Sequence, residues 1–386
     1  MASEIKNLKK AAERIKKAVK NKENIILYGD ADMDGVSSVI IVKESIKTLG
    51  GKIAEVYFPD RETEGYGVNE DALEYLKKKA PALMIIMDCG IGNFDELDKA
   101  KEMGFEVVIV DHHEVLKKLP TASIVVDPKQ KGDKYPFKEF ATVGIAFKLA
   151  QALLGEKMTP SLRQSFLELT ALATIADMMP QTDDNKELIE EGLSSLRSTV
   201  RPGLRAFFQI DPLAEKSMRE LAQKIISAAH AGGTQNHLNE AYILLTAPSL
   251  EKAEMMVRNL LEKSRDRHLQ IQAIAEEIGE VAARKMKDPI VFEGSDDWPV
   301  LMLGPAASKI CRDWKKPVFL YNRKEKESQG AVRTPKGVDG VKAMIHCSKL
   351  LGTYGGHPQA AGFRVKNEKL EDFKECLFKY FKNVKK

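Results

Sequence analysis

Residues 25–35 read Ile-Ile-Leu-Tyr-Gly-Asp-Ala-Asp-Met-Asp-Gly, a short apolar run followed by three aspartates at alternate positions. The apolar run predicts a buried strand, and the amphipathic stretch at 36–49 predicts a helix after it. Three carboxylates within five residues repel one another unless a cation neutralises them. The loop therefore favours a cation site, with a solvated acidic turn as the alternative. It is not an EF-hand, because no helix precedes it and no glutamate follows at the twelfth position.

Two later apolar runs also end in acid. The run at 83–87 leads into Asp88, and the run at 106–110 leads into Asp111-His112-His113. Because open α/β sheets bind ligands beyond the carboxyl ends of their strands, three such ends would gather carboxylates and imidazoles around one point. These are ligands of divalent metals. Two adjacent histidines cannot easily face one metal, so one is expected to bind it and the other to act on the substrate.

The first third of the chain alternates strands and helices. Further strands are predicted at 53–58 and 123–126, and further helices at 70–79 and 94–103. This alternation predicts an α/β fold with a doubly wound, mostly parallel sheet and helices on both faces. From 142 to 197 the pattern becomes helical. Thr159-Pro160 is typical of a helix start, and that helix is expected to deliver Asp177 at its end.

The second half of the chain predicts a long helix and a smaller domain. Residues 250–287 have helical periodicity interrupted only by Gly279, and strand-like runs follow at 300–303, 317–321 and 330–333. We therefore expect a domain at 1–249 whose C-terminal part is helical, a connecting helix at 250–288, and a smaller α/β domain at 289–386.

Two features of this smaller domain could hold an anion. In Gly355-Gly356-His357, the glycines allow backbone amides to approach a phosphate and the histidine adds a donor. Arg333 could pair with a phosphate through two hydrogen bonds. A glycine turn and a solvated arginine are the alternatives.

Composition sets outer limits on function. The 386 residues are 43% hydrophobic and 30% charged, as in soluble globular proteins, and the net charge of +4 permits a nucleic-acid partner without requiring one. No apolar stretch approaches the length of a membrane span, and the lysine-rich N-terminus has no secretory signal pattern. The four cysteines, Cys89, Cys311, Cys347 and Cys376, form no CxxC pair, so we expect free thiols in a cytoplasmic protein.

Together these residues resemble the DHH phosphoesterase superfamily, and within it the RecJ-type single-strand exonucleases, especially the archaeal RecJ homologues. The four family motifs resemble, in order, residues 30–35, 88–90, 111–113 and 171–177. Residues 58–61 and 65–67 resemble the RecJ segment between the first two motifs. Residues 330–333 and 355–363 resemble the DHH-associated C-terminal domain, which grips the nucleic-acid end.

The resemblance implies two divalent metal ions, Mn²⁺ first and Mg²⁺ or Co²⁺ as alternatives, bridged by Asp88. The other implied ligands are Asp30 and Asp32 for one ion and Asp34, His112 and Asp177 for the other. A bridging water would attack the phosphorus, with His113 facing the scissile phosphate as donor or general acid. Arg333, Gly355, Gly356 and His357 would hold phosphates across an interdomain cleft. The implied partners are single-stranded DNA or RNA and a replication complex such as GINS, with no membrane.

Three departures from the family pattern qualify this expectation. Tyr28 stands where many relatives carry a histidine, so Asp30 is expected to supply the missing ligand. Thr234 stands where RecJ proteins usually carry an arginine, which removes one phosphate contact. The sequence ends at Lys386, so the extra nucleic-acid domain of bacterial RecJ is expected to be absent.

Two rival functions stay open. One is a phosphodiesterase of the same superfamily that acts on short oligonucleotides or nucleotide phosphates, and the other is a replication scaffold with weak or no nuclease activity. Intact acids in all four motifs argue against the scaffold. An inorganic pyrophosphatase would share the N-terminal motifs but not the Gly-Gly-His domain.

Overall fold

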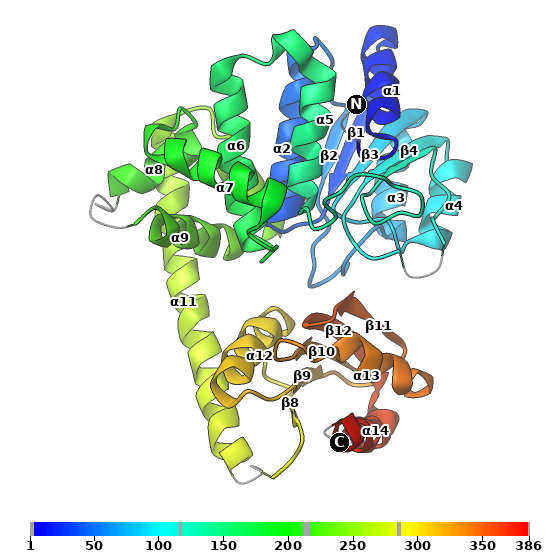
Figure 1. Cartoon of the computed structure of the whole chain (residues 1–386), viewed down its shortest axis with the longest axis vertical. Helices are drawn as coiled ribbons and strands as arrows, with labels where there is room; N and C mark the ends of the chain where they lie inside the picture. The colour runs from blue at the N-terminus through cyan, green and yellow to red at the C-terminus, as the bar shows by residue number, and fades with distance from the viewer. Residues whose placement is uncertain (1–3, 116–117, 211–216, 284–286, 385–386) are drawn as a thin grey trace. The chain divides into compact units, whose positions relative to one another are not determined.

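The computed structural model describes residues 4–115, 118–210, 217–283 and 287–384 (Figure 1). The chain forms two compact units, Met1–Ser264 and Arg265–Lys386, and each contains a five-stranded sheet. None of the described helices combines the length and the apolar composition that crossing a bilayer requires. The domain boundaries at 249 and 288 stay a prediction.

The sheet of the first unit is parallel throughout, with the strand order β2-β1-β3-β4-β5. Its elements are, in chain order, α1 (Leu8–Asn21), β1 (Asn24–Gly29), α2 (Met33–Thr48), β2 (Glu55–Tyr57), α3 (Glu70–Leu76), β3 (Ala82–Met87), α4 (Phe94–Glu102), β4 (Phe105–Val110) and β5 (Ile124–Val126). All five predicted strands and all three predicted helices of this region are present, with shifts of one to three residues at their ends. The predicted doubly wound α/β fold is confirmed.

The strands are buried on both faces, which is why they read as continuous apolar runs. In β1, Ile25 and Leu27 face one core, and Ile26 and Tyr28 face the other, because successive side chains of a strand point to opposite faces. Helices α1, α2 and α5 (Thr142–Leu154) cover the first face, and α3 and α4 cover the second (Figure 1).

The rest of the first unit is mainly helical, as predicted from 142 onward. Its elements are α5, α6 (Pro160–Ala176), α7 (Asp183–Ser195), α8 (Pro202–Ile210), α9 (Met218–His230), β6 (Thr234–Gln235), β7 (Leu238–Asn239), α10 (Glu240–Leu245) and the start of α11 (Leu250–Ala283). Thr159 caps α6 by accepting a hydrogen bond from the Leu162 amide, and Pro160 occupies the first helical turn. Residues 284–286 of the predicted long helix lie outside the described residues.

The sheet of the second unit is mixed, with the order β11-β12-β10-β9-β8 and one parallel pair, β8–β9. Its elements after α11 are β8 (Val291–Ser295), α12 (Val300–Trp314), β9 (Val318–Arg323), β10 (Glu327–Arg333), α13 (Gly340–His346), β11 (Thr353–His357), β12 (Ala360–Lys366) and α14 (Leu370–Val384). The strands expected at 317–321 and 330–333 are present as β9 and β10.

The strand predicted at 300–303 is wrong, because these residues form the first turn of α12. The buried positions continue as Leu303, Ala306, Ala307 and Ile310, which is the spacing of one helix face. A short apolar run does not distinguish a strand from a buried helical turn, and only this later spacing does so.

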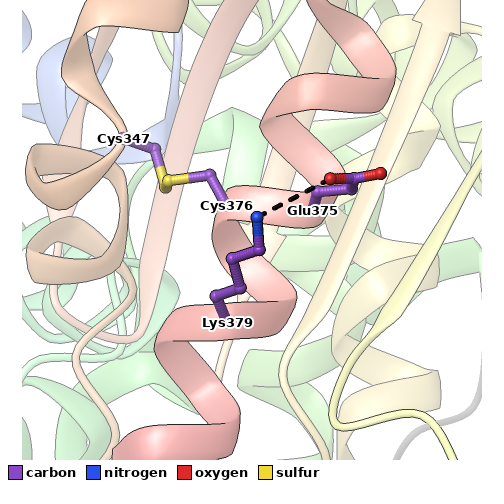
Figure 2. The surroundings of a disulfide bond; sticks show 4 residues. All are labelled: Cys347, Glu375, Cys376 and Lys379. Atoms are coloured by element: carbon purple, nitrogen blue, oxygen red, sulfur yellow. Dashed lines mark ion pairs between the residues drawn. A yellow bond between two sulfur atoms is a disulfide. The ribbon is translucent and has the colours of Figure 1, made fainter.

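The prediction of four free cysteines is also wrong for two of them. Cys347, just after α13, and Cys376, on α14, form a disulfide (Figure 2). These residues are 29 positions apart, and the packing of α13 against α14 brings them together, which residue spacing does not reveal. Cys89 and Cys311 are buried free thiols, as expected.

Candidate metal centre

The acidic loop after β1 is folded tightly onto the start of α2. Asp32 caps this helix, because its Oδ1 accepts the amide hydrogens of Asp34 and Gly35 at 2.9 and 3.0 Å. A Cβ at Gly35 would lie 2.4 Å from the Asp30 carbonyl oxygen, so only glycine fits there. The loop thereby buries Asp30 and Asp34 while leaving Asp32 partly exposed at the edge of the sheet.

Asp88 follows the neighbouring strand β3 in a left-handed backbone conformation, with φ of 64°. This conformation is uncommon for a residue other than glycine, and strain of this kind is concentrated at functional sites. Asp88 is 2% exposed, and its Oδ1 accepts a hydrogen bond from the Thr142 hydroxyl at 2.9 Å. The carboxylate is therefore held in one orientation inside the protein.

The N-terminus of α5 fixes a second carboxylate. The amides of Thr142 and Val143 donate to the two oxygens of Asp34, each at 2.8 Å. Helix N-termini stabilise negative charge, so these two hydrogen bonds partly offset the cost of burying an ionised Asp34. Sequence reasoning missed Thr142, because its partners lie more than fifty residues away in the chain.

Six residues predicted as metal ligands are brought together in two clusters. Ligand atoms of Asp30, Asp32 and Asp88 all lie within 4.8 Å of one another, and those of Asp34, His112 and Asp177 do the same. The His112 Nε2 atom lies 3.5 Å from Asp88 Oδ1 and 3.5 Å from Asp177 Oδ2, so Asp88 adjoins both clusters. This grouping coincides with the division of ligands that the family resemblance implies.

The two adjacent histidines have different surroundings. His112 is 1% exposed within the second cluster, whereas the His113 side chain is 26% exposed. The Nδ1 atom of His113 lies 2.7 Å from Asp111 Oδ1. Burial opposes ionisation of Asp111, but the charge and hydrogen bond of His113 outweigh burial and hold the pKa of Asp111 at about 2. Burial opposes the charged form of His113 too, and Asp111 again outweighs it and raises the pKa of His113.

Burial and mutual repulsion make it costly in free energy to ionise the carboxylates of this centre. Burial, followed by the charges of neighbouring aspartates, raises the pKa of Asp34 and Asp88 well above the usual value. Burial and Asp32 raise the pKa of Asp177 to about 7, and its buried Oδ2 accepts no hydrogen bond. Divalent cations would offset this repulsion and supply the missing partner, so the residues present fit a two-metal centre.

Two side chains from the segment between the first two motifs border the centre. The Arg61 guanidinium pairs with Asp30 and with Asp32, the latter at 2.9 Å. The Tyr66 hydroxyl donates to the Asp88 carbonyl oxygen at 3.1 Å and lies 3.4 Å from a His113 ring nitrogen. Tyr66 is nevertheless 54% exposed, which leaves part of its ring available to a ligand.

A fourth strand end also carries a buried acid. Asp127 follows β5, is fully buried, and accepts the Lys129 amide at 2.7 Å. Burial raises the pKa of Asp127 to about 7. Sequence reasoning missed this residue, although the rule of an acid after an apolar run would have found it.

The predicted phosphate-binding residues lie together at one end of the second sheet. Arg333 of β10 and His357 of β11 both pair with Ala360 on the strand between them, β12. Arg333 is half-buried and its Nε donates to the Ser308 hydroxyl at 3.0 Å. Gly356 has φ of 125°, and a Cβ there would lie 2.6 Å from the Ala360 carbonyl oxygen, which explains one glycine of the motif.

Comparisons with known proteins agree with this geometry. The N-terminal domain of the DHH family matches residues 24–174, and the DHHA1 domain matches residues 285–383. The chain is 34% identical to the single-stranded-DNA-specific exonuclease RecJ of Bacillus subtilis over 97% of this chain and 48% of the relative. It is 31% identical to RecJ of Thermus thermophilus, over 98% of this chain and 54% of that one. The chain thus spans about half the length of these relatives.

Solved structures give the same result. A crystal structure of exonuclease RecJ bound to manganese superposes with a TM-score of 0.80 and 28% identity, covering 98% of this chain and 95% of that one. RecJ of Thermus thermophilus in complex with Mn²⁺ gives a TM-score of 0.84 and 25% identity over 99% and 56% of the two chains. With both domains matched and the motif residues assembled at the strand ends, the chain belongs to the DHH family and is similar to RecJ.

Proposed function

We propose that the chain is a metal-dependent exonuclease that hydrolyses single-stranded DNA or RNA from an end. The observation that carries the proposal is the pair of ligand clusters adjoining Asp88. Two neighbouring ligand clusters that adjoin one carboxylate fit two-metal phosphodiester hydrolysis. RecJ relatives named as single-stranded-DNA-specific exonucleases, and RecJ structures bound to manganese, support the choice of reaction.

Two divalent ions, Mn²⁺ first and Mg²⁺ or Co²⁺ as alternatives, would supply charge neutralisation and a water of lowered pKa. Asp30 and Asp32 would hold one ion and Asp34, His112 and Asp177 the other, and Asp88, which adjoins both clusters, would contribute to both. The protein itself orients the carboxylates that would bind these ions. Thr142 and the N-terminus of α5 hold two of the carboxylates in fixed positions before the ions bind.

His113 is proposed to face the scissile phosphate. Its Nδ1 contacts Asp111, its Nε2 lies 3.4 Å from the Tyr66 hydroxyl, and its raised pKa favours the protonated ring, which could donate to a phosphate oxygen. A protonated imidazole can stabilise the developing charge or give its proton to the leaving oxygen. Asp88, His112 and His113 are therefore the proposed catalytic residues.

The second unit is proposed to bind the nucleic-acid backbone through Arg333, Gly355, Gly356 and His357. The shared register of Arg333 and His357 beside Ala360 supports this assignment. Because these residues belong to the second unit and the proposed metal ligands to the first, His357→Ala should raise KM more than it lowers kcat. Metal content measured on the same variant should be unchanged, and a variant that loses its metals would make His357 a ligand.

The test of the activity is digestion of end-labelled single-stranded DNA and RNA of several lengths with Mn²⁺. Asp88→Ala should lower the rate by about a thousandfold or more, because both ions lose a ligand. Asp98→Asn, an exposed acid on α4, is the matched control and should retain the parent rate. Activity of Asp88→Ala within tenfold of the parent would refute the proposed centre. Rates that fall with strand length would favour the small-substrate phosphodiesterase.

The proposed surroundings follow from this activity. We propose a replication complex such as GINS as partner, as the family resemblance implies, and a cytoplasmic location, as expected from the sequence. Fractionation of the source cells and co-purification with the tagged chain test these two statements separately. A chain recovered outside the cytoplasm, or without replication proteins, would contradict the respective statement.

A further inference from the structure

A hollow of the first unit lies away from the metal centre, at the far end of α2. Its volume is about 270 Å³. Lys43 and Lys47 on α2 are nine and thirteen residues beyond Asp34, which places them about 14 and 20 Å along the helix axis. The remaining lining comes from α6, α8 and α10 and their ends, and the polar lining residues besides the lysines are Glu44, Ser165, Arg201 and Thr246.

The two lysines give the hollow an uncompensated positive charge. Within the described part of the chain, no carboxylate forms an ion pair with the ammonium group of either lysine. The ammonium of Lys43 instead donates to the Tyr242 hydroxyl and lies 4.6 Å from the centre of that ring. Burial and the charge of Lys47 lower the pKa of Lys43. A half-buried ammonium without a carboxylate partner costs free energy, which a bound anion would offset.

The one acid that lines the hollow is already neutralised. Both oxygens of Glu44 accept hydrogen bonds from Arg201, at 2.9 and 3.0 Å. Arg201 is only 7% exposed and also donates to the Ser165 hydroxyl at 2.9 Å. Its Nε atom is buried and has no hydrogen-bond partner. The lining therefore presents the two positive charges of Lys43 and Lys47, and the Nε–H group of Arg201 makes no hydrogen bond.

We propose that this hollow binds a small phosphate-bearing ligand, with the phosphate held between Lys43 and Lys47. The lysines are one helical turn apart on the same face of α2, so both ammonium groups can reach one phosphate. The volume is slightly below the range of about 300–1,000 Å³ typical of small-molecule sites. It therefore suits free phosphate or a mononucleotide and is too small for a longer strand. The site is independent of the proposed nuclease reaction, since none of its residues belongs to the metal centre.

The test is calorimetric titration of the full chain, in EDTA and at low salt, with inorganic phosphate and separately with deoxyadenosine monophosphate. Lys43→Gln with Lys47→Gln should weaken binding by at least about tenfold, because both charge-assisted contacts are lost. Lys17→Gln with Lys20→Gln, which removes two exposed lysines of α1, is the matched control and should change binding by less than about twofold. Arg201 is left unchanged, because removing it would leave Glu44 without its partner and destabilise the region.

Two outcomes distinguish the sources of the phosphate. Equal affinity for both ligands means that the hollow contacts the phosphate group alone. Tighter binding of the mononucleotide means that the hollow also contacts the nucleoside. No binding of either ligand at millimolar concentration would overturn the proposal. Binding that survives in the Lys43→Gln, Lys47→Gln variant would also overturn it, because the phosphate would then lie elsewhere.

Discussion

Replacing Thr142 by valine should weaken manganese binding while leaving the fold intact. Valine has nearly the shape of threonine but lacks the hydroxyl that donates to Asp88 Oδ1 at 2.9 Å. The backbone amides of residues 142 and 143, which hold Asp34, are unaffected by the change. The substitution therefore removes one hydrogen bond to one buried carboxylate.

The size of the effect follows from the state of Asp88. Asp88 is 2% exposed, and burial and four neighbouring aspartates already raise its pKa. A hydrogen bond to a charged group contributes about 1.5–3 kcal/mol, and loss of a residue that orients a metal ligand typically costs about 10–100-fold in metal affinity. Without the hydroxyl, the pKa of Asp88 should rise further, so protons compete better with the metal. We expect manganese affinity near neutral pH to fall by about 10–100-fold.

The assay is titration of metal-free protein with Mn²⁺, followed by the electron paramagnetic resonance signal of the free ion. Thr142→Ser is the matched control, because it keeps the hydroxyl and should bind manganese within about threefold of the parent. Circular dichroism of both variants checks that the fold is retained. If the valine variant binds Mn²⁺ within about twofold of the parent, the hydroxyl does not orient Asp88 and the reasoning is refuted.

Three further outcomes are expected. Burial and Asp32 raise the pKa of Asp177 from 3.8 to about 7, so in EDTA the stability due to protonated Asp177 is present below pH 3.8 and lost as pH rises through 7. The fall in Tm over this pH window should shrink in the Asp177→Asn variant. An unchanged fall in Tm would contradict the raised pKa of Asp177. Gly35→Ala should abolish manganese binding, because its Cβ would lie 2.4 Å from the Asp30 carbonyl oxygen, whereas Gly92→Ala meets no atom within 4 Å and should bind normally. Reduction of the Cys347–Cys376 disulfide should destabilise the second unit by about 3–4 kcal/mol and leave manganese binding unchanged. The loss of stability is measured by denaturation with and without dithiothreitol, with Cys347→Ser as the reference. Equal stability of the oxidised and reduced protein would contradict a structural role of the disulfide.

The sequence predicts those parts of the site that follow directly from a strand. Asp30, Asp88 and His112 each come within two residues of the end of a buried apolar run, so the strand pattern alone brings them to one edge. Thr142 follows no strand, and its role depends on how α5 packs against α2. Such a contact depends on tertiary packing and leaves no local pattern in the chain.

The errors in the second unit have the same physical origin. Residues 300–303 taken alone fit either a strand or a helical turn, and the helix is selected by its packing against the sheet together with the helical spacing of the buried residues that follow. The pairing of Cys347 with Cys376 likewise depends on the contact between α13 and α14. In both cases the local sequence is compatible with two structures, and long-range contacts select one.

The position of the metal centre follows from strand order more than from the motifs themselves. After β1 the chain turns to one face of the sheet and forms α2, and after β3 it turns to the opposite face and forms α4. Strands β1 and β3 are neighbours, so the two connections leave in opposite directions from adjacent strand ends, as at the ligand sites of open α/β sheets. Asp30, Asp32 and Asp34 lie on the connection after β1, and Asp88 lies on the connection after β3. The order β2-β1-β3 thus places carboxylates from separate motifs within reach of shared ions, and the same motifs on non-adjacent strands would not form this centre.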